Sequence, residues 1–524
     1  MGGAFALQAQ ETPDFEVKIL ETDEPMQTGR FEPNWQSMHQ YQVPEWFKNA
    51  KFGIWAHWGP QCVEGSGDWM ARGMYQEGSG AYKHHVENYG HPSEVGFKDI
   101  LPLFKAENWQ PDSLVAYYKS LGAQYFFALG NHHDNFDLWD SKYQPWNSKN
   151  IGSKRDILAE WEKASRKYGL PFGISFHADH AWTWYEPSRR YDLKGDKVGE
   201  PYDGNLTMAD GKGKWWEGLD PQQLYRQDHP MSKGSWSNDM PDQWEWGNGA
   251  SHPSVEFATE FYNRTLDAIR RYKPDVIYFD ATILPFYPVS DAGMKILAHY
   301  YNATDGKGVA LGKILPEDIR DCLVWDVERG APNFIVPQTW QTCTCIGGWH
   351  YNQSIYDRDR YKSASTIARM LVDIVSKNGN LLLSVPLRGD GTFDEKEKKI
   401  LDEFGAWMNI NKEAIYDTRP WHKFGEGPIA ESDIKLKDQG FNEGSYAEAG
   451  ANEVRFTTKG KTIYAMPLAW PEDGKVTIRS LADKKVKSVK LLGYGKVKHH
   501  RTAEGLVVEL PAPLNGIFPV LEVK

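Results

Sequence analysis

The stretch YFFALGNHHD, residues 125–134, shows the pattern that decides the fold. Its first five residues are apolar, as in a strand buried on both faces, and the polar cluster His132-His133-Asp134 follows closely. From about residue 50 to 390, short apolar runs of this kind alternate with amphipathic stretches. This alternation predicts a buried parallel sheet, with polar side chains collected along one of its edges.

Seven apolar runs are predicted to be strands of this sheet: 52–58, 125–131, 172–176, 276–280, 309–311, 323–327 and 380–385. Helix-like segments lie between several of them, at 111–121, 154–168, 254–272 and 363–376. With seven or eight strands, this order favours a closed (β/α)8-like barrel over an open doubly wound sheet. No glycine-rich nucleotide-binding string follows any of the strands, which argues against a nucleotide-binding fold.

The chain is expected to have three parts. Residues 1–40 form an N-terminal extension that begins MGGAFALQAQE, a short apolar run with a small-residue site typical of a signal-peptide remnant. This start predicts a secreted or periplasmic protein. Residues 41–410 form the barrel, with a long Trp-rich insert at 178–250. Short alternating runs separated by turn residues predict an all-β sandwich over residues 411–524.

The composition favours a carbohydrate ligand. A formal net charge of −11 argues against nucleic-acid binding, because neutralising phosphates requires a basic surface. No run of 18 apolar residues is present, so no membrane span is expected. Aromatic residues make up 14% of the chain and include 22 Trp and 26 Tyr. Their broad apolar faces and polar tips suit the alternating apolar and hydroxyl surfaces of a sugar.

Two carboxylates are candidates for acid–base or nucleophilic chemistry. Asp280 ends the apolar run Val-Ile-Tyr-Phe-Asp, where burying a carboxylate is costly unless it has partners or a function. In a retaining glycosidase it would attack the anomeric carbon. Glu328, in Trp-Asp-Val-Glu-Arg, is the preferred candidate for the acid/base, and Asp326 on the same segment is a weaker one.

Three histidines, His57, His132 and His133, stand at predicted strand ends. Neutral imidazoles both donate and accept hydrogen bonds, so the three could bind the hydroxyls of one sugar. They could also hold a metal, with Asp280 and Asp134 completing the shell. The metal is the less favoured alternative, because neighbouring histidines on an extended chain point to opposite faces. We therefore expect neither a metal nor another cofactor.

Several segments resemble the α-L-fucosidases of glycoside hydrolase family 29 and occur in the same order: WFKNAKFGIWAHWGP (46–60), GNHHDNFDLWDSKYQPWNS (130–148), KRDIL (154–158), DVIYFD (275–280), SKNGNLLLSVP (376–386) and NKEAIYDTRPW (411–421). The resemblance implies a catalytic barrel followed by a β-sandwich. It also implies retaining hydrolysis of terminal α-L-fucose without a metal. It assigns the nucleophile to Asp280, sugar binding to His57, His132 and His133, and an aromatic contact to Tyr278.

Departures from the family pattern leave alternatives open. Gln341, in Trp340-Gln341-Thr-Cys, stands where many relatives carry a Glu, which is the acid/base in some branches. Gln cannot transfer a proton, so Glu328 would take this role, or the chain would bind glycans without cleaving them. Lys313 is nearest to the usual sugar-binding Arg. Trp58, Trp340 and Gln341 are predicted to contact the sugar, which could also be a relative of fucose such as α-L-galactose.

Overall fold

The computed structural model describes residues 11–234, 244, 246–432, 440–446, 449–514 and 516–524. The predicted signal-peptide remnant lies in residues 1–10, outside the described residues, so export stays a prediction. Within the described residues, no helix combines the length and the apolar character that crossing a membrane requires.

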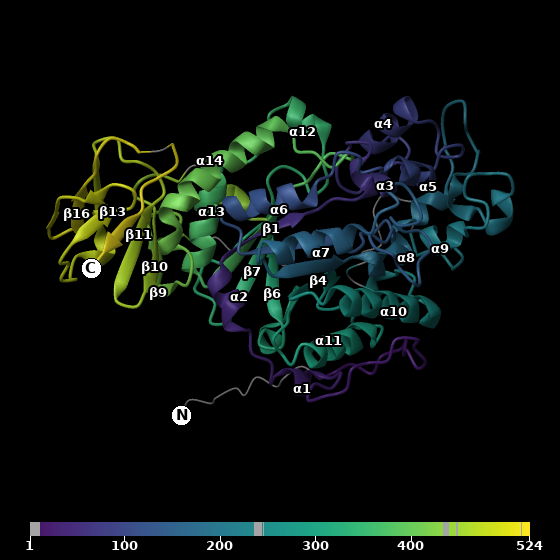
Figure 1. Cartoon of the computed structure of the whole chain (residues 1–524), viewed down its shortest axis with the longest axis horizontal. Helices are drawn as coiled ribbons and strands as arrows, with labels where there is room; N and C mark the ends of the chain where they lie inside the picture. The colour runs from purple at the N-terminus through teal and green to yellow at the C-terminus, as the bar shows by residue number, and fades with distance from the viewer. Residues whose placement is uncertain (1–10, 235–243, 245, 433–439, 447–448, 515) are drawn as a thin grey trace.

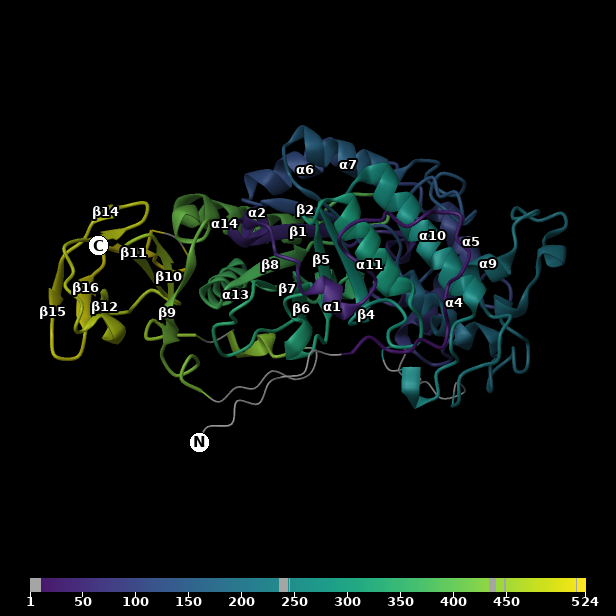
Figure 2. The same ribbon diagram turned by 90° about the horizontal axis from the view of Figure 1, so that it is seen from below.

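Eight parallel strands close into a barrel in chain order, β1 to β8, as the sequence predicts (Figures 1 and 2). The strands pair in register around the circle, and β8 returns to pair with β1. Nearly all their residues are buried on both faces, which explains the continuous apolar runs. The strands are β1 Phe52–Ala56, β2 Tyr125–Leu129, β3 Phe172–Phe176, β4 Val276–Thr282, β5 Val309–Lys313, β6 Val324–Glu328, β7 Trp340–Cys345 and β8 Gly379–Ser384.

One barrel strand, β7, is absent from the seven that the sequence predicts. Its residues WQTCTC are all buried, although five of the six are Gln, Thr or Cys. Their polar atoms are satisfied inside the barrel: Gln341 accepts from the Tyr125 hydroxyl at 2.9 Å and donates to Asp326 at 2.8 Å. Thr342 donates to the Gly330 carbonyl at 2.8 Å. A strand of this composition has no apolar run to mark it.

Helices cover most of the barrel's outer face. Four of the long ones begin at a Ser or Asp whose side chain accepts a backbone N–H of the first turn. No α-helix follows β5 or β6 directly, so the barrel departs there from the regular repeat. The barrel helices are α6 Pro111–Ser120, α7 Ile157–Lys167, α10 Val255–Tyr272, α11 Ala292–Ala303, α13 Ala364–Ser376 and α14 Glu395–Asn411. Shorter ones are α2 Glu45–Ala50, α3 Met70–Gly73, α4 Gly80–Asn88, α5 Phe97–Ile100 and α12 Gln353–Asp357.

The described part of the N-terminal extension, residues 11–40, runs along α10 and α11 and contains the short helix α1, Trp35–Met38 (Figure 1). Val17 pairs with Ser290 in an isolated parallel bridge, and the Ile19 N–H donates to Asp291 at 2.9 Å. The carboxylate of Glu24 forms an ion pair with Arg270 of α10. The extension is thus fixed to the outside of the barrel.

The insert at 178–250 lies at the end of the molecule opposite the C-terminal domain (Figures 1 and 2). Its described part has only short helices, among them α8 Ala181–Trp184 and α9 Pro221–Tyr225. Four of its seven tryptophans are buried, and Trp215 is exposed. Trp236 lies outside the described residues, and Trp244 lines the cavity described below.

The C-terminal domain consists of two antiparallel sheets with a small apolar core of their own, which confirms the predicted β-sandwich. The larger has the order β14-β13-β17-β11-β10-β9 and the smaller β12-β16-β15. The strands are β9 Arg419–Glu426, β10 Val454–Lys459, β11 Thr462–Pro467, β12 Lys475–Ile478, β13 Val489–Leu491, β14 Gly495–Lys496, β15 His499–Arg501, β16 Leu506–Glu509 and β17 Leu521–Val523.

The larger sheet packs against the barrel helices α13 and α14. Trp407 of α14 stacks edge-on against Phe518 with ring centroids 4.9 Å apart, and its indole N–H donates to the Phe518 carbonyl. Arg455 of β10 is fully buried and forms ion pairs with Asp373 of α13 and with Glu453. Apolar and charged contacts therefore both join the two domains.

Candidate active site

A cavity with an empty volume of about 620 Å³ opens at the carboxyl ends of the barrel strands, the edge where barrel enzymes place their chemistry. Six of its lining residues stand at or just beyond the ends of consecutive strands β1 to β6. The lining residues are Trp55, His57, Asp68, Trp69, His132, His177, Trp244, Tyr278, Asp280, Lys313, Glu328, Trp349 and Phe441.

Two carboxylates in this cavity share one ammonium group. Lys313, the last residue of β5, forms ion pairs with Asp280 of β4 and with Glu328 at the end of β6. The Lys313 Nζ lies 2.6 Å from the Glu328 Oε2. The carboxylate side chains are 14% and 13% exposed, so each still opens onto the cavity. The structure thus brings together the two carboxylates that the sequence selects.

Electrostatic contacts fix the charge state of Asp280. Burial by itself would raise the pKa of its carboxyl, but the Lys313 ammonium and the contacts with His133 and His177 outweigh burial and hold that pKa well below its usual value. Burial likewise disfavours the Lys313 ammonium, yet Asp280 and Glu328 raise the pKa of Lys313 well above its usual value. At neutral pH Asp280 is therefore an unprotonated carboxylate.

Histidines surround the same space. The ring centroids of His57, His132 and His350 lie 4.6–5.1 Å from one another. The ring centroids of His132 and His133 are 4.3 Å apart. Burial lowers the pKa of His57 and of His132 well below the ordinary value and lowers that of His177 to about 4. These three imidazoles are therefore neutral at physiological pH. Each can both donate and accept a hydrogen bond.

Local hydrogen bonds select the tautomers of two histidines. The Gln61 side-chain amide donates to His132 Nδ1 at 2.7 Å, which leaves the proton of His132 on Nε2. His133 Nδ1 lies 3.0 Å from the His177 carbonyl and donates to it, which leaves Nε2 facing the Asp280 Oδ2 at 3.3 Å. Within the described residues, neither ring nitrogen of His57 has a hydrogen-bond partner, although both are buried. Buried polar atoms of this kind are normally paired, so the cluster is arranged to receive a hydroxylated ligand.

Two groups of these side chains have the spacing of a metal site, namely His57, Asp68, His132 and His350, and His132, His133 and His177. The tautomer of His132 fits a sugar better than a metal. Its Nε2 carries the proton, whereas a metal ligand nitrogen must be unprotonated. The donor set of this cluster therefore favours hydroxyl groups.

Aromatic rings form the walls of the cavity. Trp55 packs against Tyr278 with centroids 5.0 Å apart, and Trp349 packs against Trp55 at 5.8 Å. On another wall, Trp69 from the loop after β1 stacks on Trp244 of the insert, 5.8 Å apart and 8° from parallel. The insert thus contributes directly to the cavity.

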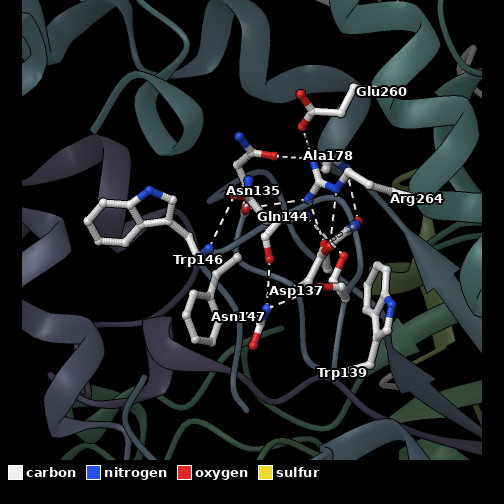
Figure 3. Close-up of polar contacts among 12 residues, drawn as sticks. Asn135, Asp137, Trp139, Gln144, Trp146, Asn147, Ala178, Glu260 and Arg264 are labelled. Atoms are coloured by element: carbon white, nitrogen blue, oxygen red, sulfur yellow. Dashed lines mark hydrogen bonds and ion pairs between the residues drawn. The ribbon is translucent and has the colours of Figure 1, made fainter. Parts of the chain in front are cut away.

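A buried polar network holds the loop that carries His132 and His133 (Figure 3). Arg264 of α10 binds Asp137 through two hydrogen bonds of 3.1 and 2.6 Å and donates to the Asn135 side chain at 2.7 Å. Asn135 has a left-handed backbone with a φ of 63°, which Asn tolerates better than most residues. The Gln144 amide donates to the Asn135 carbonyl at 3.1 Å. The network therefore fixes the turn that follows the two histidines.

Three residues predicted to contact the sugar lie away from the cavity. Trp58 follows His57 on extended chain and so points to the opposite side, where its indole donates to the Arg388 carbonyl. Trp340 and Gln341 stand at the start of β7, three and two residues before Cys343, which pairs with Glu328. Trp340 donates to the Lys377 carbonyl, and Gln341 is buried in the barrel interior. These placements do not support direct sugar contacts.

The weaker acid/base candidate, Asp326, is also inside the barrel. It accepts from the Gln341 amide and from the Cys343 thiol, and burial raises its pKa to about 6. It does not line the cavity. Glu328, two residues later on β6, does.

His177 directly follows β3, and its place at a strand end marks it as a candidate functional residue from the sequence alone. Several other cavity residues were not selected from the sequence. Asp68, Trp69 and Trp349 come from loops, and Phe441 comes from beyond the barrel. These four residues lie outside the apolar strand runs, so the hydrophobic pattern of the sequence does not identify them as cavity residues.

Comparison with known proteins agrees with this geometry. Residues 18–413 match the alpha-L-fucosidase family, and residues 448–519 match the alpha-L-fucosidase C-terminal domain. The chain belongs to the alpha-L-fucosidase family. The resemblance seen in the sequence is thereby confirmed, and the chain is a glycoside hydrolase of the α-L-fucosidase type.

Relatives within the family cover almost the whole chain. The tissue alpha-L-fucosidase of Rattus norvegicus is 27% identical over 500 residues, which are 94% of this chain and 90% of that relative. The plasma alpha-L-fucosidase of Homo sapiens is 26% identical and covers 92% of this chain and 89% of its own length. The solved structure of Thermotoga maritima alpha-fucosidase in complex with fucose superposes with a TM-score of 0.67 at 25% identity, covering 94% of this chain and 100% of that one.

Proposed function

We propose that this α-L-fucosidase family member releases terminal α-L-fucose from glycans or polysaccharides with retention of configuration. Asp280 is the nucleophile and Glu328 the acid/base. The observation that carries the proposal is the contact of both carboxylates with the single ammonium of Lys313 in one cavity.

The spacing of the carboxylates supports the retaining route. Retaining pairs lie about 5–5.5 Å apart, whereas inverting pairs need about 6.5–9.5 Å to fit a water molecule. Because Asp280 and Glu328 both contact the Lys313 Nζ, their contacting oxygens can be no further apart than these two short contacts laid end to end, which favours the shorter class. Asp280 is therefore close enough to attack the sugar that Glu328 protonates.

The charge of Lys313 matches the chemistry of double displacement. The first step of a retaining glycosidase needs an ionised nucleophile and an acid that carries its proton, so the pair then holds one negative charge, which one buried cation compensates. When the Asp280 oxygen bonds to the anomeric carbon, Glu328 gives its proton to the leaving oxygen, and the negative charge moves to Glu328. Water then loses a proton to Glu328 and displaces Asp280. Throughout these steps, Lys313 remains in contact with whichever carboxylate is charged.

The histidines and aromatic rings supply recognition. Neutral His57 and His132 can exchange hydrogen bonds with ring hydroxyls, and the Nε2 of His133 can accept a hydroxyl proton beside Asp280. Trp55, Tyr278 and Trp349 offer apolar faces to the C–H surface of the sugar. A cavity enclosed in this way admits a chain end, which fits an exo-acting enzyme.

The proposal is tested by nitrophenol release from 4-nitrophenyl α-L-fucoside, measured with the parent, Asp280→Asn, Glu328→Gln and the exposed control Glu317→Gln. We expect activity in the parent and the control, a loss of at least 1,000-fold in Asp280→Asn, and rescue of one or both site variants by azide. Parent-like activity of Asp280→Asn would overturn the assignment of the nucleophile. A parent that cleaves the α-L-galactoside but not the fucoside would overturn the assignment of the sugar.

A further inference from the structure

Phe441 lines the catalytic cavity although it belongs to the segment after the barrel. Its side chain is 51% exposed. Large apolar side chains are more often buried, and one that is exposed at a cavity mouth commonly marks a binding surface. The mechanism described above gives Phe441 no role.

The backbone of Phe441 is fixed to the end of β6. Its N–H donates to the Glu328 carbonyl at 2.9 Å, and Gly440 pairs with Glu328 in a parallel bridge. The Asn442 side chain accepts the Ala331 N–H and donates to the Ala331 carbonyl, at 2.9 and 3.0 Å. The ring is therefore presented from a backbone that is tied to the acid/base itself.

An ion cluster secures the same segment two residues later. Glu443 contacts Arg329 at 2.8 Å and Lys362 at 3.0 Å and accepts the Thr344 hydroxyl at 2.6 Å. Burial alone would raise the pKa of Glu443. These contacts outweigh burial and lower the pKa of Glu443 below its usual value. The segment is thus joined to β6, to β7 and to the chain before α13, and Phe441 has little freedom to leave the cavity mouth.

The position beside Glu328 decides what the ring contacts. An acid/base protonates the oxygen of the departing group, so that group lies on the side of the cavity where Glu328 stands. An aromatic ring on that side provides a flat apolar surface for the C–H face of a sugar. The fucose itself is enclosed deeper, among the histidines and Asp280.

We propose that Phe441 forms a leaving-group subsite, a platform for the sugar residue to which the terminal fucose is attached. The subsite rests on the proposed function, because it assumes that Glu328 is the acid/base. It assigns the natural substrate to the class of fucosylated saccharides in which the penultimate unit is a pyranose with an apolar face. Small leaving groups gain nothing from the platform.

The test compares two substrates, α-L-fucosyl fluoride and a panel of α-L-fucosyl disaccharides, in the full-length protein. The variants are Phe441→Ala, the conservative Phe441→Tyr and the control Phe334→Ala, whose phenylalanine is 52% exposed and does not line the cavity. For the disaccharide that the parent cleaves best, we expect kcat/KM to fall at least tenfold in Phe441→Ala. On α-L-fucosyl fluoride, the kcat/KM of Phe441→Ala should stay within twofold of the parent value. Phe441→Tyr should keep most of the parent's activity on the disaccharide.

A second readout is independent of turnover. In the Asp280→Asn background, Phe441→Ala should weaken binding of the disaccharide at least fivefold and leave binding of free fucose unchanged. Equal losses on the fluoride and the disaccharide, or no loss on either, would overturn the subsite. A parent that is inactive on the fluoride as well would overturn the proposed function, and with it the subsite.

Discussion

Lys313 is the residue on which the charge balance of the site depends, because among the described residues it contacts both carboxylates. Its stem also passes the Tyr278 ring, with the Nζ 5.8 Å from the ring centroid. A cation at this place does two things. It keeps Asp280 ionised, and in the proposed mechanism it stabilises the charge that appears on Glu328 when the leaving group departs.

Replacing Lys313 with Met should lower kcat/KM on 4-nitrophenyl α-L-fucoside by about 100-fold, the usual cost of losing one preorganised electrostatic contact. The acid limb of the pH profile should move to higher pH, because Lys313 no longer holds down the pKa of Asp280. Lys313→Arg keeps the charge and should keep the acid limb. An unchanged acid limb in Lys313→Met would show that Lys313 does not set the charge of Asp280.

His177 should make the protein less stable in acid. Its pKa is about 4 in the folded state because it is buried, and about 6.5 in the unfolded chain. Between these values the unfolded chain binds a proton that the folded protein excludes, so stability falls as pH drops through this window and levels off below pH 4. Between pH 7 and pH 5, the protonation of His177 in the unfolded chain lowers the free energy of unfolding by about 2 kcal/mol.

Urea unfolding of the parent and of His177→Gln at pH 7 and pH 5 measures this effect. When the pH is lowered from 7 to 5, the free energy of unfolding of His177→Gln should fall by about 2 kcal/mol less than that of the parent. The exposed His500→Gln serves as a control and should follow the parent. The same pH dependence in all three proteins would contradict the expected contribution of His177.

At the level of single residues, the sequence predicted the reactive groups better than the supporting ones. Asp280, Glu328, His57 and His132 line the cavity because parallel strands end at one edge of the barrel, a rule that needs only the strand positions. Trp58 was misplaced because its neighbour His57 already occupies the cavity side. Asp68 and Trp69 could not be found, since loop residues reach a site only through the three-dimensional path of the chain.

Among the elements, the loop after β2 depends most on a distant partner. Arg264 of α10 reaches Asn135 and Asp137 in this loop, and all three side chains are buried (Figure 3). Asn131 also donates to Asp137 at 2.9 Å and accepts the His177 N–H at 3.1 Å. The loop, β3 and α10 are thereby joined through one carboxylate.

Replacing Arg264 with Met should destabilise the protein by about 3–5 kcal/mol, because Asp137 would remain as an uncompensated buried charge. Urea unfolding at pH 7 measures the change. Arg271→Met on the same helix is the control, since Arg271 is 38% exposed and pairs with Asp267 one turn away. That variant should lose less than about 1 kcal/mol. Similar losses in both variants would argue against a special role for the buried pair.

The elements also show where sequence patterns stop. The strands β1 to β4 are apolar throughout or nearly so and were predicted within a few residues. Strand β7 was missed because its Gln, Thr and Cys side chains are satisfied by partners elsewhere in the fold, on β2, β6, the loop after β6 and Glu443. Burial of a polar strand depends on tertiary contacts, and the hydrophobic periodicity of the local sequence does not indicate it.

For the whole molecule, the joint between barrel and sandwich contains a buried charge cluster. Arg455 contacts Asp373 and Glu453, and Lys377 lies 2.7 Å from Asp373. Such clusters are costly to break because each remaining charge loses its compensation. The two domains are therefore expected to unfold together.

Arg455→Met should lower the free energy of unfolding by about 3–5 kcal/mol. The control Arg479→Met removes a half-exposed partner of Glu431 on the sandwich surface and should cost less than about 1 kcal/mol. Calorimetry checks both and reports whether one transition or two occur. A single transition with a lower Tm in Arg455→Met is expected, and an unshifted Tm would contradict the role of the cluster.

The attachment of residues 440–446 to β6 has a consequence for how the enzyme is made. Glu328 and Phe441 are 113 residues apart in the chain, yet the Phe441 N–H donates to the Glu328 carbonyl at one rim of the barrel. At about 5–20 residues per second, a ribosome needs roughly 6–23 s to synthesise the chain between them. During that interval the nascent chain contains Asp280 and Glu328 but lacks Phe441. The growing polypeptide thus acquires the proposed acid before it acquires the ring that we propose selects what the acid releases.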